Sequence, residues 1–261
     1  MPKLTPYAVW GLMKELRVAA HDRRPLVVSG PLAAQLAKEL GRGADPGALR
    51  VDGGAPDGAA LVRVLTGAAT EEDERELLAA NRAGVPIVAV QTAPDVYDIP
   101  YVLATDVVSC PPGSGFPVEE VAAALATRLG DQAIGLAARV PALRDAVAAA
   151  LIERFSRQNG IIGAAVFVPG ADFAVLTLNQ LRLVLRLAVV YGIEVDQQRL
   201  PEVLATLGAG LGFRAVARQL LGTVPIAGWV IKGGVAYTGT RVLGEGAQRY
   251  FQGVSEREAV A

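Results

Sequence analysis

Cysteine, histidine and aromatic residues are scarce in this chain of 261 residues. Cys110 is its one cysteine, so no disulfide bond can form within the chain, and this scarcity of thiols predicts a reducing compartment. His21 is its one histidine, so the chain lacks the Cys and His ligands of a structural zinc site. Cys110 ends an apolar segment before two prolines, which favours a buried, inert thiol over a nucleophile paired with His21. We therefore expect no metal, no cofactor and no catalytic thiol.

An excess of positive charge is also absent. The 25 Lys and Arg residues are balanced by 26 Asp and Glu residues, which gives a formal net charge of −1. Proteins that bind nucleic acid usually carry a basic excess, so nucleic acid is not an expected partner. Residues 1–25 show a short amphipathic helix pattern rather than a continuous apolar stretch behind a basic start. We therefore expect no signal peptide and a cytoplasmic location.

Aliphatic residues, in contrast, are abundant. Hydrophobic residues make up 52% of the chain although aromatic residues supply only 5%, and the mean hydropathy is +0.36. The hydrophobic fraction and the mean hydropathy both exceed the usual averages for soluble proteins. Much of the surplus falls in the C-terminal third, so that region is expected to be deeply buried in protein or placed in lipid.

Apolar strands alternate with helical patterns between Arg24 and Gly130. The strand segments are short apolar runs, typical of strands that are buried on both faces of a parallel sheet. They cover residues 25–30, 60–67, 85–92 and 101–110, with a possible short strand over 49–51. Helical spacing of apolar residues fills the intervals, and Thr70 is placed to accept a hydrogen bond from the amide of Asp73 at the start of one helix. This alternation predicts an α/β domain with a parallel sheet.

Helical patterns continue from residue 118 to the end of the chain. Residues 140–160 predict a strong amphipathic helix, which Asn159 and Gly160 are expected to end. The apolar run that follows, residues 160–168, is shorter than the ~20 residues that a membrane-spanning helix needs. Pro169 interrupts any longer count. We expect a hairpin or two helices that meet at this proline.

A polar stripe marks the helix after Pro169. Asp172 is placed to cap this helix, and Asn179, Arg182 and Arg186 fall on one side of it among leucines and valines. Each charge at the centre of a bilayer costs about 3 kcal/mol or more, so the stripe is expected to face protein, water or lipid headgroups. These four residues form a candidate polar seam, either structural or for interaction.

Small residues recur near the C-terminus. Ala236, Thr240 and Gly244 are four positions apart, and this spacing lets a second helix approach closely. Gly208 and Gly212 repeat the spacing. Because each glycine inside a helix costs about 1 kcal/mol, close packing must offset that cost. Ala236, Thr240 and Gly244 are therefore a candidate seam for helix packing or for a homo-oligomer.

A longer pattern covers residues 159–251. It begins with NGIIGAAVFVPGADFAVLTLNQLRLVLRLAVVYGI and ends with LGAGLGFRAVARQLLGTVPIAGWVIKGGVAYTGTRVLGEGAQRYF. These glycine-rich, apolar blocks, with Pro-Gly-Ala-Asp inside the first, resemble domain of unknown function family 697 (DUF697). The resemblance implies a helical domain that often follows an Era-like GTPase domain, and it implies membrane association.

A GTPase context implies a phosphate-binding loop, Gly-x-x-x-x-Gly-Lys-Ser/Thr, after the first strand. Gly30 stands where the first glycine of the loop is expected. Gln35, Leu36 and Ala37 stand where the second glycine, the lysine and the magnesium-binding hydroxyl are expected. Residues 91–95, QTAPD, replace the base-reading Asn-Lys-x-Asp. The N-terminal domain is therefore predicted to be degenerate and P-loop-like, although an unrelated Rossmann-like domain would give the same pattern.

The domain organisation that follows is an α/β domain over residues 1–130 and a hydrophobic, glycine-rich, all-α domain over residues 131–261. The favoured function is a non-catalytic adaptor or scaffold with a pseudo-GTPase domain, at the inner face of the cell membrane. Its expected partner is the membrane surface or a membrane protein. The alternatives are a nucleotide-responsive switch with an atypical pocket and a fully soluble protein-interaction module.

Overall fold

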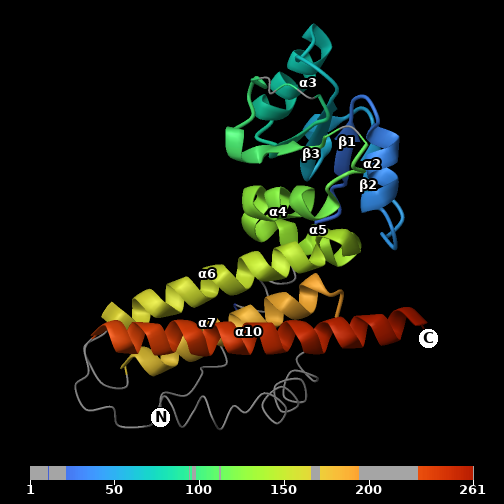
Figure 1. Ribbon diagram of the computed structural model, residues 1–261. Helices are drawn as coiled ribbons and strands as arrows, with labels where there is room; N and C mark the ends of the chain where they lie inside the picture. The colour runs from blue at the N-terminus through green and yellow to red at the C-terminus, as the bar shows by residue number, and fades with distance from the viewer. Residues whose placement is uncertain are drawn as a thin grey trace. The chain divides into compact units, whose positions relative to one another are not determined.

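The computed structural model of the chain is drawn in Figure 1. It describes residue 11 and residues 22–93, 95, 98–111, 113–165, 171–193 and 229–260. The chain divides into two compact units, and the division falls between Ala150 and Leu151. The first unit contains the sheet, and the described helices α7 and α10 belong to the second.

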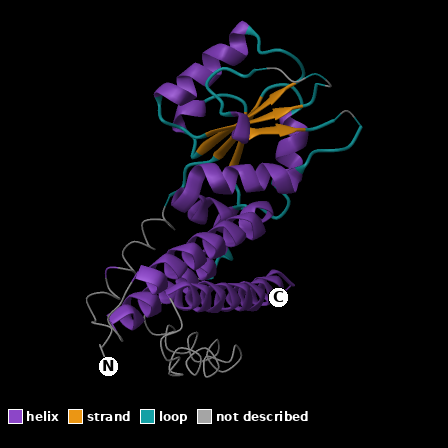
Figure 2. Cartoon of the chain, turned by 60° about the vertical axis from the view of Figure 1, so that its left-hand side comes forward, coloured by secondary structure: helices purple, strands orange, loops and turns teal. Residues whose placement is uncertain are grey.

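A five-stranded parallel sheet is the centre of the first unit, and the strand arrows of Figure 2 point the same way. The strand order is β2-β1-β3-β4-β5. The predicted α/β fold with a parallel sheet is confirmed. The strands are β1 (Leu26–Ser29), β2 (Leu49–Val51), β3 (Ala60–Leu65), β4 (Ile87–Gln91) and β5 (Val107–Ser109).

Helices cover both faces of this sheet. The helix α2 (Ala33–Leu40) packs on β1 and β2 and contacts α4 (Val118–Leu129), which packs on β4 and β5. The helix α3 (Glu71–Arg82) belongs to the opposite face, where its Leu77 packs in a cluster with Leu61 of β3 and Ala89 of β4. All residues of β1, β3 and β4 are buried, as the apolar runs predict for a sheet covered on both sides.

The strand predicted over residues 101–110 is largely wrong, because β5 covers only Val107–Ser109. Tyr101 adopts a left-handed backbone conformation with φ +65°, which an extended strand cannot contain. A 3₁₀ turn, Ala104–Asp106, follows two residues later. Pairing with β4 begins where Val107 lies beside Ala89.

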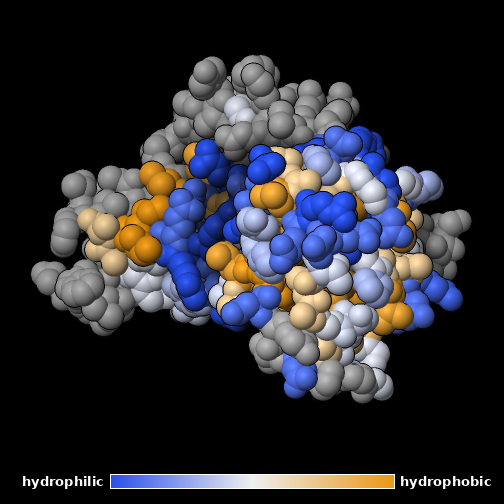
Figure 3. All heavy atoms as spheres, turned by 90° about the horizontal axis from the view of Figure 1, so that it is seen from above, coloured by the Kyte–Doolittle hydropathy of each residue, from blue (hydrophilic) through white to orange (hydrophobic). Residues whose placement is uncertain are grey.

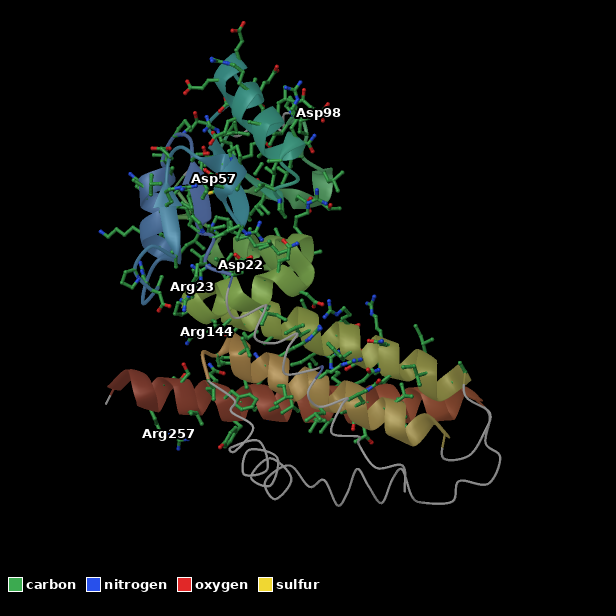
Figure 4. The ribbon with its side chains drawn as sticks, turned by 180° about the vertical axis from the view of Figure 1, so that it is seen from behind. Asp22, Arg23, Asp57, Asp98, Arg144 and Arg257 are labelled. Atoms are coloured by element: carbon green, nitrogen blue, oxygen red, sulfur yellow. The ribbon has the colours of Figure 1, made fainter. Side chains whose placement is uncertain are left out.

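The short helix α5 (Ala133–Arg139) follows α4 and packs within the α/β unit. The Arg139 guanidinium is buried, and it donates hydrogen bonds to the carbonyl oxygens of Arg23 at 3.3 Å and Arg24 at 2.6 Å. Burial lowers the pKa of Arg139, with the neighbouring Arg23 acting in the same direction. Figure 4 labels Arg23 and also Arg144, which begins the next helix and donates to the carbonyl oxygen of Ala138. The α/β unit therefore extends beyond its last strand and includes α5.

The described helices of the second unit are α7 (Ala171–Val190), α10 (Trp229–Val260) and the part of α6 (Arg144–Ala165) that follows Ala150. The predicted stop at Asn159 and Gly160 is wrong, because α6 continues to Ala165. The Asn159 side chain is held by a hydrogen bond to Thr240, and a side chain at Gly160 would crowd Tyr237 of α10. Tertiary packing therefore overrides a local stop signal. None of the helices in the described ranges combines the length and apolar character needed to cross a bilayer.

Candidate binding crevice

The sheet has a topological switch point between β1 and β3. After β1 the chain returns to β2 on one side, and after β3 it goes through α3 to β4 on the other side. The connections thus leave these neighbouring strands in opposite directions and open a crevice at their carboxyl ends. In open parallel sheets this is where ligands bind.

A crevice of about 540 Å³ lies at this position. Its walls come from the segments that follow β1, β2 and β3 and from the first turn of α3. The lining residues are Gly30, Pro31, Asp52, Arg63, Leu65, Thr66, Gly67, Ala68, Thr70, Glu72 and Asp73. The volume lies within the range of ligand pockets, which is roughly 300 to 1,000 Å³.

Gly30 is required where β1 meets the crevice. Its φ is +94°, a conformation that side chains other than glycine rarely adopt. A Cβ atom at this position would lie 2.3 Å from the carbonyl oxygen of Val64 and 3.1 Å from Nε of Arg63. Both the backbone conformation and the close approach of β3 therefore exclude a side chain here.

Arg63 forms the floor of the crevice and ties three elements together. Its side chain leaves β3 on the α3 face, because it shares that face with Leu61 and Leu65 and alternates with Val62 and Val64, which are buried on the other face of the sheet. Its Nε donates to Oδ1 of Asp73 at 2.8 Å. Its Nη1 donates to Oγ of Ser29 at 3.2 Å.

The same network includes Glu76 of α3. Arg63 forms an ion pair with Glu76, whose Oε2 also accepts a hydrogen bond from the hydroxyl of Ser29 at 2.9 Å. Arg63 and Asp73 are 8% and 5% exposed, so this is a buried network rather than a surface ion pair. Sequence reasoning missed Arg63. Its single charge within the apolar strand ALVRVL could have indicated a buried ion pair, because a buried charge needs a partner.

Asp73 also belongs to the predicted cap of α3, which is confirmed. The Thr70 hydroxyl accepts from the Asp73 amide at 3.3 Å, and Oδ2 of Asp73 accepts from the Thr70 amide at 2.7 Å. Burial alone would raise the pKa of Asp73. Hydrogen bonds from Thr70 and Arg63 outweigh that effect and hold the pKa below its ordinary value of 3.8.

Backbone strain and exposed aliphatic side chains are found beside the crevice. Leu32 follows the lining residue Pro31, has φ +64° and is 44% exposed. A left-handed conformation costs a residue of this kind about 1 to 3 kcal/mol, and such strain is concentrated at functional sites. Val51 precedes the lining residue Asp52 and is 41% exposed. In Figure 3, hydrophilic and hydrophobic residues are mixed over the face of the molecule that is shown.

Three of the positions compared with a phosphate-binding loop, residues 35–37, lie on α2. Leu36 and Ala37, in the places of the lysine and the hydroxyl, are buried against the interior of the unit. Gln35 is exposed. Gln91, at the start of the QTAPD segment, is the last residue of β4 and is buried, and Asp95 is exposed.

The comparison with protein families concerns the C-terminal half. The model of the family described as "Domain of unknown function (DUF697)" matches residues 130–260. The chain belongs to the DUF697 family. No curated protein and no solved structure matches the chain. The DUF697 match begins before the division between the compact units, so the first part of the family segment, including α5, belongs to the unit that contains the sheet.

Within the DUF697 segment, the predicted small-residue seam lies on one buried side of α10. Ala236, Thr240 and Gly244 are all buried. A Cβ atom at Gly244 would lie 2.8 Å from Cγ1 of Ile152 on α6 and 3.1 Å from a methyl carbon of Leu183 on α7. Gly244 is therefore at a point of close contact with both of the other described helices.

The residues of the predicted polar seam separate into different settings. Asn179 is buried and donates from Nδ2 to Oδ1 of Asn159 at 3.0 Å, and Asn159 donates to Oγ1 of Thr240 at 2.8 Å. The Arg186 guanidinium lies 5.4 Å from the centre of the Phe155 ring, whereas Nε of Arg182 is buried without a hydrogen-bond partner. The side chain of Asp172, like Gly208 and Gly212, lies outside the described residues.

Sequence reasoning also missed Gln180 and Ser156, two further buried polar residues of these helices. Gln180 of α7 donates from Nε2 to Oγ1 of Thr240 at 3.3 Å, so three helices meet at one hydroxyl. Ser156, one helical turn before Asn159, is fully buried, and its hydroxyl has no hydrogen-bond partner. In the sequence, Asn159 before Gly160 indicates a helix stop, which is the commoner role of Asn before Gly.

Proposed function

We propose that this protein is a non-catalytic adaptor or scaffold. Its α/β unit binds a partner in the crevice between β1 and β3, and its DUF697 helices hold it at a membrane surface or at a membrane protein, on the cytoplasmic side. The observation that carries the proposal is the crevice itself. It is built at the ligand-binding position of the fold, while the charged group at its floor, Arg63, is already bonded to protein partners.

The chemistry of the lining argues against a nucleotide and against phosphoryl transfer. Phosphate binding in such folds relies on a lysine and on bare backbone amides at the first loop, and Leu36 occupies the place of the lysine. Carboxylates from Asp52, Glu72 and Asp73 line the crevice. Two like charges 4 Å apart near a protein surface repel by about 4 kcal/mol, so these groups disfavour a polyphosphate.

Calorimetry with GTP and GDP in the presence of magnesium tests the non-catalytic part of this proposal. We expect no binding at micromolar nucleotide and no hydrolysis of GTP. Magnesium-dependent binding at micromolar or tighter affinity would favour a nucleotide-responsive switch and would overturn the proposal.

Fractionation of cells that express the full chain tests the membrane part. We expect the protein to sediment with membranes and to be released by an alkaline or high-salt wash, as a peripheral protein is. Recovery of all of the protein in the supernatant before any wash would contradict membrane association. That result would favour a fully soluble interaction module.

A further inference from the structure

We infer that the crevice between β1 and β3 binds a basic segment of a partner protein, with a lysine or arginine side chain inserted beside Asp52 and Glu72. This inference rests on the proposed adaptor function and names the chemistry of its partner.

The charge of the crevice is negative. Asp52, Glu72 and Asp73 line it, Glu76 joins the network at its floor, and Arg63 is the single cation among the lining residues. Arg63 is itself shared between the carboxylates of Asp73 and Glu76, so it neutralises one of those two charges and leaves the other. A cationic group is therefore the ligand with complementary charge.

The carboxylates of Asp52 and Glu72 are available to bind a ligand. The side chains of Asp52 and Glu72 are exposed, and neither forms an ion pair with any residue that the structure describes. They come from different elements, because Asp52 follows β2 whereas Glu72 lies in the first turn of α3. A guanidinium or ammonium group that enters the crevice would bond carboxylates from both sides, which gives it charge-assisted hydrogen bonds.

Exposed aliphatic residues that adjoin the lining residues in sequence suit the methylene stem of such a side chain. Leu32 and Val51 are exposed aliphatic residues next to the lining residues Pro31 and Asp52. Lysine and arginine pack their methylene stems on apolar surface while their charged ends bond to polar groups. Thr66, Gly67 and Ala68 keep the opposite wall small, and a Cβ atom at Gly67 would have nothing within 4 Å. The cavity is thus open to an extended side chain.

Fluorescence anisotropy of the full chain with a short labelled peptide rich in lysine and arginine tests the inference. A length-matched peptide rich in glutamate is the ligand control. We expect saturable binding of the basic peptide and about tenfold weaker binding in the double variant Asp52→Asn, Glu72→Gln, since two partly exposed ion pairs together supply roughly that factor. The variant Glu119→Gln, Glu120→Gln removes the same charge from the exposed start of α4 and should bind as the wild type does.

A steric variant distinguishes binding inside the crevice from general electrostatic attraction of the basic peptide. Gly67→Trp adds a large side chain to the lining at a position where a Cβ atom has space and φ is not positive, so the fold should tolerate it. The bulk of the tryptophan in the crevice should then prevent peptide binding. Ala123→Trp, at an exposed position of α4, is the matched control and should bind normally. Equal loss in both charge variants, or full binding by Gly67→Trp, would overturn the inference.

Three further outcomes test the identity of the ligand. Spermidine that binds as tightly as the peptide would show a polyamine site and would overturn a protein partner. Absence of peptide binding, with normal membrane retention and no nucleotide binding, would reject the basic segment while leaving the adaptor proposal in place. Tight binding of GTP, in contrast, would reject both.

Discussion

Arg63 on β3 and Asp73 on α3 are joined by a hydrogen bond of 2.8 Å between Nε and Oδ1, and both side chains are almost completely removed from solvent. The pair connects a central strand to the helix that forms one wall of the crevice. Because Ser29 of β1 bonds to the same guanidinium, both strands at the switch point are fixed relative to α3. The shape of the crevice therefore depends on one buried cation.

Replacing this cation should destabilise the α/β unit strongly. Arg63→Met leaves Asp73 and Glu76 without their partner, and breaking a buried ion pair from one side costs about 3 to 5 kcal/mol. Urea unfolding should show this loss. Arg82→Met, at the exposed end of α3, is the control and should change stability by less than about 0.5 kcal/mol. A small effect of Arg63→Met would show that the network contributes little.

The lowered pKa of Asp73 predicts a dependence on pH. Since the folded pKa lies below the ordinary value of 3.8, the stabilisation from Asp73 is fully present above that value and is lost as the pH falls through the folded pKa. The protection of α3 amides against hydrogen exchange, relative to the intrinsic exchange rate at each pH, should therefore fall below about pH 4 in the wild type. Asp73→Asn should exchange faster at neutral pH and should lose much of this acid dependence. An unchanged acid response in Asp73→Asn would assign the effect to other carboxylates.

Two glycines of α10 offer a matched pair of variants. Gly244→Leu places atoms against Ile152 and Leu183, and such overpacking costs about 1 to 3 kcal/mol. Gly234→Leu meets nothing within 4 Å, and replacing a helical glycine there should be neutral or stabilising by up to about 1 kcal/mol. Limited proteolysis and thermal unfolding should separate the two variants. Equal protease resistance and equal oligomeric state in both would show that the seam is incidental.

The hydroxyl of Thr240 should contribute to the stability of the helical unit. Thr240→Val keeps the shape of the side chain but removes the acceptor for Asn159 and Gln180, and each unsatisfied buried group costs about 1 to 3 kcal/mol. The thermal midpoint should fall accordingly. Arg182→Leu, at a position whose Nε has no partner, should cost less than Thr240→Val. The reverse order would mean that the arginine, not the amide network, organises these helices.

Signals whose partners are close in sequence predict the α/β unit well, whereas contacts between distant elements leave no such signal. The cap at Thr70 was predictable because its partner, Asp73, is three residues away, and the strands were predictable because burial on both faces leaves an apolar run. Arg63 gave no such information, since its partners come from β1 and α3. Its role emerges only when the sheet brings those elements together.

The helical unit gives the same lesson at Asn159 and Gly160. Before a fold is known, Asn-Gly indicates the end of a helix, because both residues tolerate the left-handed conformation of a C-terminal cap. In the folded chain Asn159 bonds to Thr240, and Gly160 and Gly233 approach so closely that a Cβ at Gly233 would lie 2.9 Å from the Gly160 oxygen. The two residues serve a helix crossing that no local pattern describes.

The small residues of α10 help to set its alignment along α6. Ala236, Thr240 and Gly244 repeat every helical turn, so a slide of α10 by one turn, about 5.4 Å, would bring another small residue opposite Ile152. The shifted alignment would crowd α6, because a Cβ atom at the present place of Gly244 would lie only 2.8 Å from Cγ1 of Ile152. It would also carry Thr240 away from Asn159 and leave buried amide groups without an acceptor. The absence of a side chain at Gly244 and the hydroxyl of Thr240 thus select the same alignment of the two helices.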